Sequence, residues 1–164
     1  GESGSGKTTI VDKLAEKFGY TVLKSFTTRA PRNEGDTDHT FISLEEYDNL
    51  QNKVATCEFN GAFYCATAEQ VEESDLYVID CDGIRELKEK YHGTKEIVVI
   101  YINTPMDIRL ERMLKRGDGD KAWERLKHDY DAFRNVRGLA NHTVNGIPEQ
   151  CWFDVAYIID AKEG

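Results

Sequence analysis

The chain opens with Gly1-Glu2-Ser3-Gly4-Ser5-Gly6-Lys7-Thr8-Thr9, which fits the phosphate-binding pattern G-x-x-x-x-G-K-[ST]. Its glycines permit the left-handed turns that direct successive backbone N–H groups at phosphate oxygens. Lys7 can supply a mobile positive charge for the β- and γ-phosphates, and the Thr8 hydroxyl can ligate Mg²⁺. A Gly/Ser-rich linker is the alternative interpretation. The expected nucleotide contacts are Gly1, Ser3, Gly4, Ser5, Gly6, Lys7, Thr8 and Thr9.

A helix is predicted directly after this loop, from about Lys7 to Phe18, with Gly19 placed to end it. The positive end of its dipole would face the same phosphate and so favours nucleotide binding over a linker. A loop of this kind normally follows a buried parallel strand, and here the chain begins at the first glycine of the loop. We therefore expect further residues before Gly1.

The composition fits one domain, because 164 residues with 40% hydrophobic content can bury a substantial core. A net charge of −9 argues against a nucleic-acid partner, which would require a basic face. It leaves room for a local cationic pocket and small-molecule nucleotide substrates. The sequence gives no indication of the oligomeric state.

The four cysteines, Cys57, Cys65, Cys81 and Cys151, show neither CxxC spacing nor a Cys/His cluster. They predict buried thiols in a reducing compartment, with metal binding as the alternative. The sequence has no long apolar run and no signal-peptide pattern, so we expect a cytoplasmic protein without a membrane partner.

Strand-like and helical segments alternate along the chain, which predicts an α/β domain with a parallel sheet. Asn60-Gly61 joins two strand-like runs and is a strong hairpin signal, so a small antiparallel insertion is expected there. Predicted strands cover residues 21–23, 40–42, 54–59, 62–66, 76–79, 96–102 and 155–159, and a loop covers 141–151. Predicted helices cover residues 44–50, 67–74, 83–91 and 105–117, then a long amphipathic helix marked by Trp123, Leu126, Tyr130, Phe133 and Val136.

A second anion site is indicated by Arg29 and Arg32, which flank Pro31 in the run Ser25-Phe26-Thr27-Thr28-Arg29-Ala30-Pro31-Arg32. A forked guanidinium suits bidentate binding of phosphate, and proline restrains the placement of the two arginines. Two solvated surface arginines are the alternative.

Three further arginines, Arg112, Arg116 and Arg125, surround the hinge-like break at 117–120. Arg112 and Arg116 share a helix face, where like charges repel unless an anion arrives. One interpretation is a mobile lid whose arginines close on a transferring phosphoryl group. Ordinary exposed helix charge is the other.

Asp80 and Asp82 follow the predicted buried strand 76–79, at the sheet edge where α/β ligands bind. Asp80 could hold the water shell of a magnesium ion, and Asp82 could contact a substrate. Alternatively, Asp82 is the N-cap of a helix that starts at Gly83.

The run 25–32 resembles the S-x-T-T-R-x-P-R signature of guanylate kinases, and the motif order over essentially the whole chain is similar to that family. The resemblance implies a P-loop NTPase-type parallel sheet flanked by helices, with an antiparallel acceptor insertion and a mobile helical lid. It implies one domain, with a core of residues 1–19, 67–111 and 129–164, an acceptor-binding insertion at 20–66 and a lid at 112–128. It also implies transfer of the ATP γ-phosphate, with Mg²⁺, to a nucleoside monophosphate, GMP or dGMP being favoured.

The same resemblance assigns roles to particular residues. Arg29, Arg32 and Tyr64 would hold the acceptor phosphate, beside His39, while Ser25 and Asp82 would face the base. Lys7, Arg29, Arg112, Arg116 and Arg125 would be the catalytic residues, and Thr8 and Asp80 would serve the metal.

The departures from the family pattern concern recognition of the acceptor. His39 stands where the family has a phosphate-binding tyrosine, Ala55 where a glutamate reads guanine, and Ala66 where a hydroxyl contacts the base. Glu58 lies three residues beyond Ala55 and would face the opposite side of a regular strand. Another nucleoside monophosphate or ribose 1,5-bisphosphate therefore stays open as the acceptor. A non-catalytic guanylate-kinase-like binding module is the alternative of a different class.

Overall fold

The structure is a computed structural model that describes residues 1–31, 33–59 and 61–163. These residues divide into two compact units. The first unit consists of Gly1–Gly19 with Val98–Gly164, and the second of Tyr20–Ile97.

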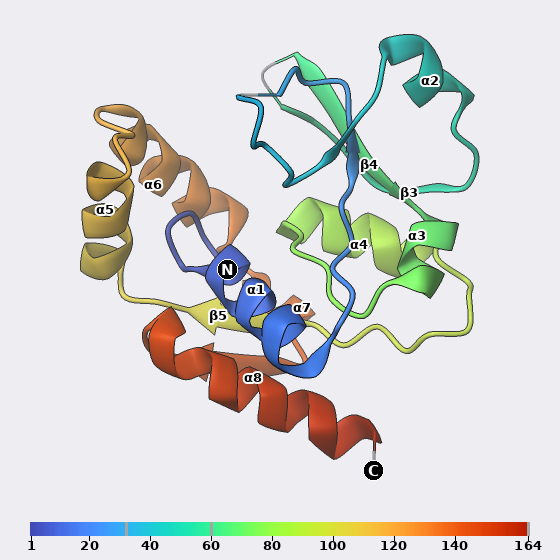
Figure 1. The fold of residues 1–164 in the computed structure, drawn as a ribbon. Helices are drawn as coiled ribbons and strands as arrows, with labels where there is room; N and C mark the ends of the chain where they lie inside the picture. Colours follow the sequence, from blue (N-terminus) through green and yellow to red (C-terminus); the bar gives the residue numbers. More distant parts are fainter. Residues whose placement is uncertain (32, 60, 164) are drawn as a thin grey trace. The chain divides into compact units, whose positions relative to one another are not determined.

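The first unit combines a short parallel sheet with helices (Figure 1). Strands β5 and β6 pair in parallel, with Ile100 opposite His142 and Asn103 opposite Asn145. Its elements are α1 (Lys7–Phe18), β5 (Ile100–Asn103), α5 (Met106–Lys115), α6 (Lys121–Ala132), α7 (Val136–Leu139), β6 (His142–Asn145) and α8 (Pro148–Glu163).

Helix α1 confirms the helix predicted after the glycine-rich loop. Its buried residues Ile10 and Leu14 are four apart and so lie on one face. Gly19 ends the helix in the left-handed conformation at φ 76°, and its N–H donates to the carbonyl of Ala15. A residue with a Cβ would be strained there, so the glycine fixes where the helix stops.

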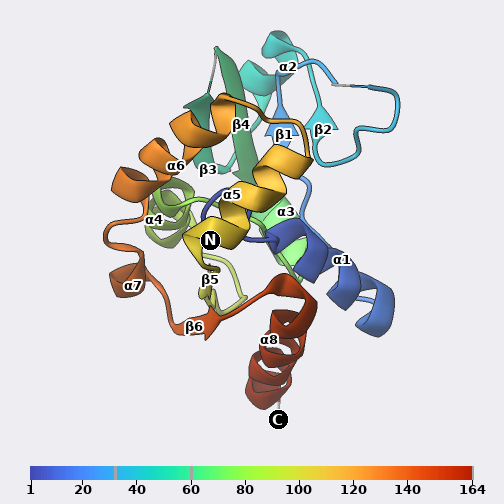
Figure 2. The same ribbon diagram turned by 90° about the vertical axis from the view of Figure 1, so that its left-hand side faces the viewer.

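Helix α8 replaces the strand predicted at 155–159, so that prediction was wrong. Pro148 is the first helical residue, where its fixed φ and missing N–H are tolerated. Cys151 and Val155 are buried while Phe153 and Tyr157 are exposed, which is a helical rather than an alternating pattern. The helix runs without interruption in Figure 2 and packs against α1 and β6. A short apolar run fits a buried strand or a helix equally well, and the residues around it decide.

Strand β6 lies within the segment 141–151 that was predicted as a loop, so that prediction was wrong over β6. The predicted strand 96–102 is confirmed only in its second half, as β5. Asn141 links the two chain segments just before β5 and β6 pair, because its side-chain Oδ1 accepts the Val99 N–H at 2.8 Å.

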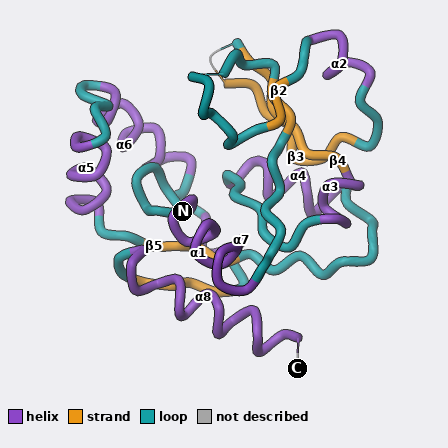
Figure 3. The backbone as a smooth tube through the Cα atoms, viewed as in Figure 1, coloured by secondary structure: helices purple, strands orange, loops and turns teal. Residues whose placement is uncertain are grey.

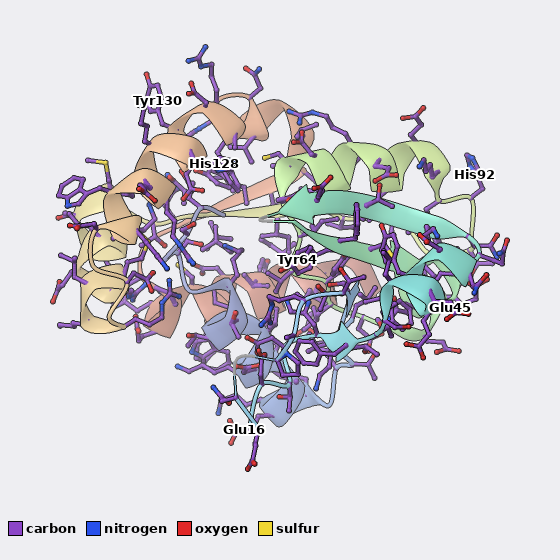
Figure 4. The ribbon with its side chains drawn as sticks, turned by 90° about the horizontal axis from the view of Figure 1, so that it is seen from above. Glu16, Glu45, Tyr64, His92, His128 and Tyr130 are labelled. Carbon is purple, nitrogen blue, oxygen red and sulfur yellow. The ribbon has the colours of Figure 1, made fainter. Side chains whose placement is uncertain are left out.

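Helices α5 and α6 confirm the predicted break around residues 117–120, but the long helix predicted after it is shorter. Helix α6 ends at Ala132, and α7 is separate. Ala122 and Leu126 pack against the fully buried Met113. Trp123 and Tyr130 are 59% and 75% exposed, and Figure 4 shows Tyr130 projecting outward from α6. Of the residues expected on the apolar face, Leu126 is confirmed in the core, whereas Trp123 and Tyr130 are exposed and Ala122 makes the core contact beside Leu126.

The second unit contains a mixed four-stranded sheet, drawn in orange in Figure 3. The strand order is β2-β1-β4-β3, with β1 and β2 parallel and the other pairs antiparallel. The predicted hairpin is confirmed as β3 and β4, although Asn60 of its turn lies outside the described residues. The elements are β1 (Phe26–Thr27), β2 (Thr40–Phe41), α2 (Leu44–Asn49), β3 (Lys53–Phe59), β4 (Ala62–Thr67), α3 (Ala68–Glu73) and α4 (Cys81–Lys90).

The strands predicted at 21–23 and 76–79 are reduced to a single parallel bridge between Val22 and Leu76. Residues 77–79 are half-buried rather than buried on both faces. A strand needs a neighbouring backbone to bond with, and within the described residues Val22 supplies one at Leu76 alone. The α/β class is confirmed, and among the described residues purely parallel pairing occurs in the β5–β6 sheet.

No helix within the described residues combines the length and the apolar character needed to cross a membrane.

Short helices α2 and α3 begin with capping boxes, as expected for α2. The Ser43 side chain accepts the Glu46 N–H at 3.1 Å, and the Glu46 carboxylate accepts the Ser43 N–H at 2.7 Å. These hydrogen bonds from Ser43 lower the pKa of Glu46. Thr67 and Gln70 form the same arrangement at α3. Each box satisfies backbone donors that a helix leaves free at its start.

We expect Ser43→Ala to destabilise the second unit by about 1 kcal/mol, because the Glu46 N–H loses its acceptor. Equilibrium denaturation followed by circular dichroism measures the change, with Ser43→Asp as the matched control that keeps an acceptor. Equal loss of stability in both variants would contradict the assigned cap.

Candidate functional site

A cavity of about 370 Å³ in the first unit is the candidate site. It brings the N-terminal loop together with arginines more than a hundred positions away in the sequence. The residues that line it are Ser3, Gly4, Gly6, Lys7, Thr8, Thr9, Arg112, Met113, Arg116 and Arg125. Two expected contacts do not line it: Ser5, within the loop, is fully buried, and the carbonyl of Gly1 accepts a hydrogen bond from Lys7.

The loop backbone lies directly against two helices. Gly4 and Gly6 adopt φ 76° and 83°, in the left-handed region. A Cβ on Gly4 would lie 2.7 Å from the carbonyl oxygen of Arg109 in α5, and one on Gly6 would lie 2.0 Å from Cγ of Pro148 in α8. Both positions therefore require glycine for conformation and for space.

The start of α1 is prepared for an anion. Gly6 is the N-cap and offers no side-chain acceptor, and the first turn contains no acidic residue. The first N–H groups of a helix have no partner within it, and the helix dipole adds positive potential at the same point. Because Lys7, Thr8 and Thr9 line the cavity, a phosphate there would meet these donors.

Lys7 is folded back onto the loop. Its Nζ donates to the carbonyls of Gly1 at 2.6 Å and Glu2 at 3.0 Å. Burial lowers the pKa of Lys7, and the carboxylates of Asp129 and Glu2 oppose that shift. The nearby carboxylates therefore favour the charged ammonium at a position where burial alone disfavours it.

Each of the three cavity arginines has a carboxylate partner. Arg112 contacts Glu149 at 2.8 Å, Arg116 pairs with Asp118, and Arg125 lies 3.7 Å from the same Asp118. The expectation that these arginines repel one another until an anion arrives was therefore wrong.

Sequence reasoning treated the Gly-Asp-Gly-Asp segment as a hinge and missed the role of Asp118. The signal was present, because Asp118 is the one acidic residue between Arg116 and Gly119. Ion pairs as exposed as these typically contribute about 0–1 kcal/mol, so a polyphosphate can displace them.

In the second unit, three expected substrate residues lie together. Ser25 Oγ is 3.0 Å from His39 Nδ1, and the rings of His39 and Tyr64 are 5.4 Å apart in an edge-to-face arrangement. The antiparallel pairing of β1 with β4 explains why these residues meet, because it places Phe26 opposite Cys65 and Thr27 opposite Tyr64.

Arg29 is held by an acidic residue that sequence reasoning missed. Its Nη2 lies 3.0 Å from Oδ2 of Asp36, whose side chain is only 3% exposed. The guanidinium also lies 5.2 Å from the centre of the Phe41 ring. Asp36 sits in the polar loop expected at 33–38, where nothing in the pattern distinguished it from Glu34 or Asp38. Arg32 lies outside the described residues.

Asp80, not Asp82, is the N-cap of α4, so the alternative considered for Asp82 was wrong. Asp80 Oδ1 accepts the Gly83 N–H at 2.7 Å, and the helix starts at Cys81. A cap bonds to the N–H two or three residues onward, which fits Asp80. Asp82 is 86% exposed and pairs with Arg85. Of the two residues expected to serve the metal, Thr8 belongs to the first unit and Asp80 to the second.

Ala55 and Ala66, at the two positions expected to read a base, are buried in an apolar cluster with Val54 and Leu87. The strand is not regular here, because the register shifts between Val54 and Cys57. Ala55 adopts φ 52°, as a bulged residue can.

Glu58 pairs with Phe63 and Cys57 pairs with Tyr64. Side chains alternate along a strand, so Glu58 lies on the face opposite Tyr64 even with the bulge. The interpretation that Glu58 cannot substitute for the missing glutamate therefore agrees with the register.

Glu86 of α4 completes the bulge. Its carboxylate accepts the Thr56 N–H and also the Thr56 hydroxyl at 2.8 Å. Burial alone would raise the pKa of Glu86, but hydrogen bonds from Lys90 and Thr56 outweigh it, so the pKa is lowered. The β3–β4 pairing is interrupted at Thr56, and the Glu86 carboxylate therefore accepts the Thr56 N–H in place of a strand carbonyl.

The four cysteines are free thiols, of which Cys65, Cys81 and Cys151 are buried and Cys57 is half-buried. Burial raises the pKa of Cys57 and Cys65 to about 11, so these thiols stay protonated near neutral pH. Within the described residues, no group of three or more His, Cys, Asp and Glu side chains is placed to hold a metal ion.

Comparison with known proteins gives consistent results. A sequence model of one family, described as guanylate kinase, matches residues 1–144. The guanylate kinase of Chlamydia caviae is 34% identical over 142 residues, covering 77% of this chain and 68% of that protein. The guanylate kinase of Geobacter metallireducens is 34% identical over 171 residues of alignment, covering 96% of this chain and 77% of that protein.

Solved structures of guanylate kinase share the fold. The guanylate kinase from Anaplasma phagocytophilum matches with a TM-score of 0.71 over 95% of this chain and 81% of that chain, at 23% identity.

We expect Glu86→Ala to cost about 1–3 kcal/mol of stability at neutral pH, because it leaves the half-buried Thr56 N–H without the acceptor that it has in the structure. Glu89→Ala, an exposed glutamate on the same helix, is the matched control and should change little. Urea denaturation measures both variants, and equal effects would contradict the role of Glu86.

The stability from Glu86 should also depend on pH. Because its pKa is lowered on folding, its contribution is complete above the ordinary glutamate value of 4.5 and is lost as the pH falls through the lowered pKa. The difference in unfolding free energy between the wild type and Glu86→Gln should shrink over that range. A difference that is constant with pH would contradict it.

Proposed function

The chain belongs to the guanylate kinase family and is a nucleoside monophosphate kinase, and we propose that it transfers the γ-phosphate of ATP to GMP or dGMP. The observation that carries the proposal is a cavity of the first unit that is lined by the loop, by Lys7 and by the three arginines. A polyphosphate is the ligand that fits such a set, because backbone donors, an ammonium and forked guanidinium groups all bind phosphate oxygens.

The residues of the cavity act on different parts of the nucleotide. The N–H groups of the loop and the start of α1 bind and orient the phosphates. Lys7 leaves its carbonyl partners for the β- and γ-phosphates, and Arg112, Arg116 and Arg125 stabilise the charge that spreads over the transferring group. A phosphate oxygen of the acceptor forms the new bond to the γ-phosphorus while the bond to ADP breaks. An ionised phosphate is already a nucleophile, so no general base is required.

Magnesium is the proposed metal, bound together with ATP. Thr8 lines the cavity and offers a hydroxyl oxygen, the ligand type that Mg²⁺ takes beside phosphates and water. Asp80 uses Oδ1 to cap α4, which leaves Oδ2 as a hard oxygen for the water shell. When bound, the ion neutralises phosphate charge.

The second unit is proposed to bind the acceptor. Arg29, Arg32 and Tyr64 would hold its phosphate beside His39, and Ser25 and Asp82 would face the base. In the same proposal, residues 20–66 form the acceptor-binding insertion, residues 112–128 the lid, and the rest the core. Family membership and the motif order support these assignments.

A different acceptor is the second candidate, and one observation favours it. Ala55 and Ala66 are only 5% and 0% exposed and belong to the apolar core, so neither offers a hydrogen bond to a base. Losing two such bonds would weaken the preference for guanine by about a hundredfold. Another nucleoside monophosphate or ribose 1,5-bisphosphate would not need them.

A coupled assay of ADP release with GMP, dGMP, AMP, UMP, CMP and ribose 1,5-bisphosphate tests the acceptor. We expect GMP or dGMP to give the highest kcat/KM. Turnover of AMP or UMP at least as efficient as that of GMP would overturn the proposed substrate, and a preference for the bisphosphate would establish the second candidate.

We expect Lys7→Ala to lower kcat by at least about 100-fold, since it removes a charge that stabilises the transferring phosphoryl group. The unliganded variant should melt within about 3 °C of the wild type, because the loss of two hydrogen bonds is offset by removal of a buried charge. Lys13→Ala, on the same helix but beside Trp152 rather than the cavity, is the matched control. Near-normal turnover in Lys7→Ala would contradict the assigned role.

A further inference from the structure

Three ionic side chains form a buried triad behind the phosphate-binding loop. Arg109 of α5 lies between Glu2 of the loop, at 3.8 Å, and Asp129 of α6, at 3.6 Å. The side chains of Arg109, Glu2 and Asp129 are only 9%, 14% and 7% exposed. The triad is separate from the arginines that line the cavity, and its members come from three different elements.

The geometry is poor for stability alone. Within the part of the chain that the structure describes, Arg109 Nε and Nη1 and Glu2 Oε2 are buried without a hydrogen-bond partner. Removing charges from water is costly, and well-packed apolar side chains of similar size are often as stable as a buried ion triad. The arrangement therefore needs an explanation beyond packing.

Asp129 acts directly on the loop. Its Oδ2 accepts the backbone N–H of Ser3 at 2.7 Å, across 126 positions of sequence. On the other side of the same turn, the backbone of Gly4 lies against the backbone of Arg109, where no Cβ would fit. The loop is thus fixed at Ser3 by α6 and at Gly4 by α5, the two helices that carry Arg125 and Arg112.

The triad also faces the reactive end of the loop. It holds two carboxylates and one guanidinium, so its net charge is negative. Asp129 and Glu2 support the ammonium form of Lys7 while Arg109 opposes it, within an environment whose burial lowers the pKa of Lys7. Arg109 therefore moderates the carboxylates without cancelling them.

We propose that Asp129 is a positioning residue of the nucleotide site: held by Arg109, it fixes the phosphate-binding loop against α5 and α6 and thereby sets the affinity for ATP·Mg²⁺. The inference rests on the proposed function, because it takes ATP as the ligand of the cavity. Asp129 does not line the cavity, so its effect on the nucleotide passes through Ser3 and Lys7.

The test compares Asp129→Asn with Asp131→Asn. The first keeps an oxygen for the Ser3 N–H but removes the charge that faces Arg109 and Lys7. The second removes a charge from the same helix at a side chain that is 71% exposed and paired with Arg134. Isothermal calorimetry measures the Kd for ATP·Mg²⁺, and the coupled assay measures KM for GMP.

We expect Asp129→Asn to raise the Kd for ATP·Mg²⁺ by about 10- to 100-fold, the effect of disturbing a buried charge-assisted contact. The KM for GMP should change by less than about threefold, and Asp131→Asn should match the wild type. Hydrogen exchange of the peptide 1–9 should be faster in Asp129→Asn than in Asp131→Asn. A lower melting temperature with unchanged Kd and unchanged exchange of this peptide would mean a purely structural role and overturn the proposal.

A double-mutant cycle with Arg109→Met tests whether the two residues act together. Arg109→Met in the Asp129→Asn background should cost less affinity than in the wild type, because the guanidinium is then already without that carboxylate. Independent, multiplicative effects would overturn the coupling. If Asp129→Asn does not fold, the double variant, in which Glu2 can take up a proton, serves for the Kd measurement.

The calorimetry also separates this inference from the proposed function. A wild type that binds ATP·Mg²⁺ but does not phosphorylate GMP would refute the substrate, while the comparison of Kd values would still decide the role of Asp129.

Discussion

The phosphate-binding loop keeps its shape because its backbone lies directly against two helices. At Gly4 it touches the backbone of α5, and at Gly6 it touches the ring of Pro148 at the start of α8. Both glycines are left-handed, so neither the turn nor the contact tolerates a side chain. Helix α5 follows β5 and α8 follows β6, and because these strands pair in parallel, both helices start at the same edge of the sheet. The arrangement of β5, β6, α5 and α8 in the first unit therefore determines the close contact with the loop at Gly4 and Gly6.

Charge balance is the second theme of the structure. Every arginine assigned to phosphate in the described residues has a carboxylate partner: Arg29 has Asp36, Arg112 has Glu149, and Arg116 and Arg125 share Asp118. Lys7 rests on backbone carbonyls. In this protein with a net charge of −9, nearby carboxylates thus hold the cationic side chains in place. A phosphate that binds these side chains must first displace the carboxylates.

The sequence was most informative where a residue type has one physical use. Gly19, the Ser43 cap and the spacing of Ile10 and Leu14 were predicted correctly because left-handed φ, an N-cap and a helical face each need specific residues. The strand predicted at 155–159 failed because an apolar run suits two structures. Asp118 was missed although it lies two residues after Arg116, and nothing in the loop pattern distinguishes Asp36 from Glu34 or Asp38. The triad of Arg109 could not be found from the sequence, since Glu2, Arg109 and Asp129 meet only through tertiary contacts.

The ion pair between Arg29 and Asp36 has a consequence for ligand selection. Under the proposed assignment, an incoming group must take the place of a carboxylate that is almost fully buried. A singly charged anion would exchange one unit of negative charge for another and gain little. A doubly ionised terminal phosphate would bring a surplus unit. Under this assignment, the ion pair would favour a doubly ionised phosphate over a phosphodiester or an uncharged nucleoside on electrostatic grounds, independently of contacts with a ring or a sugar.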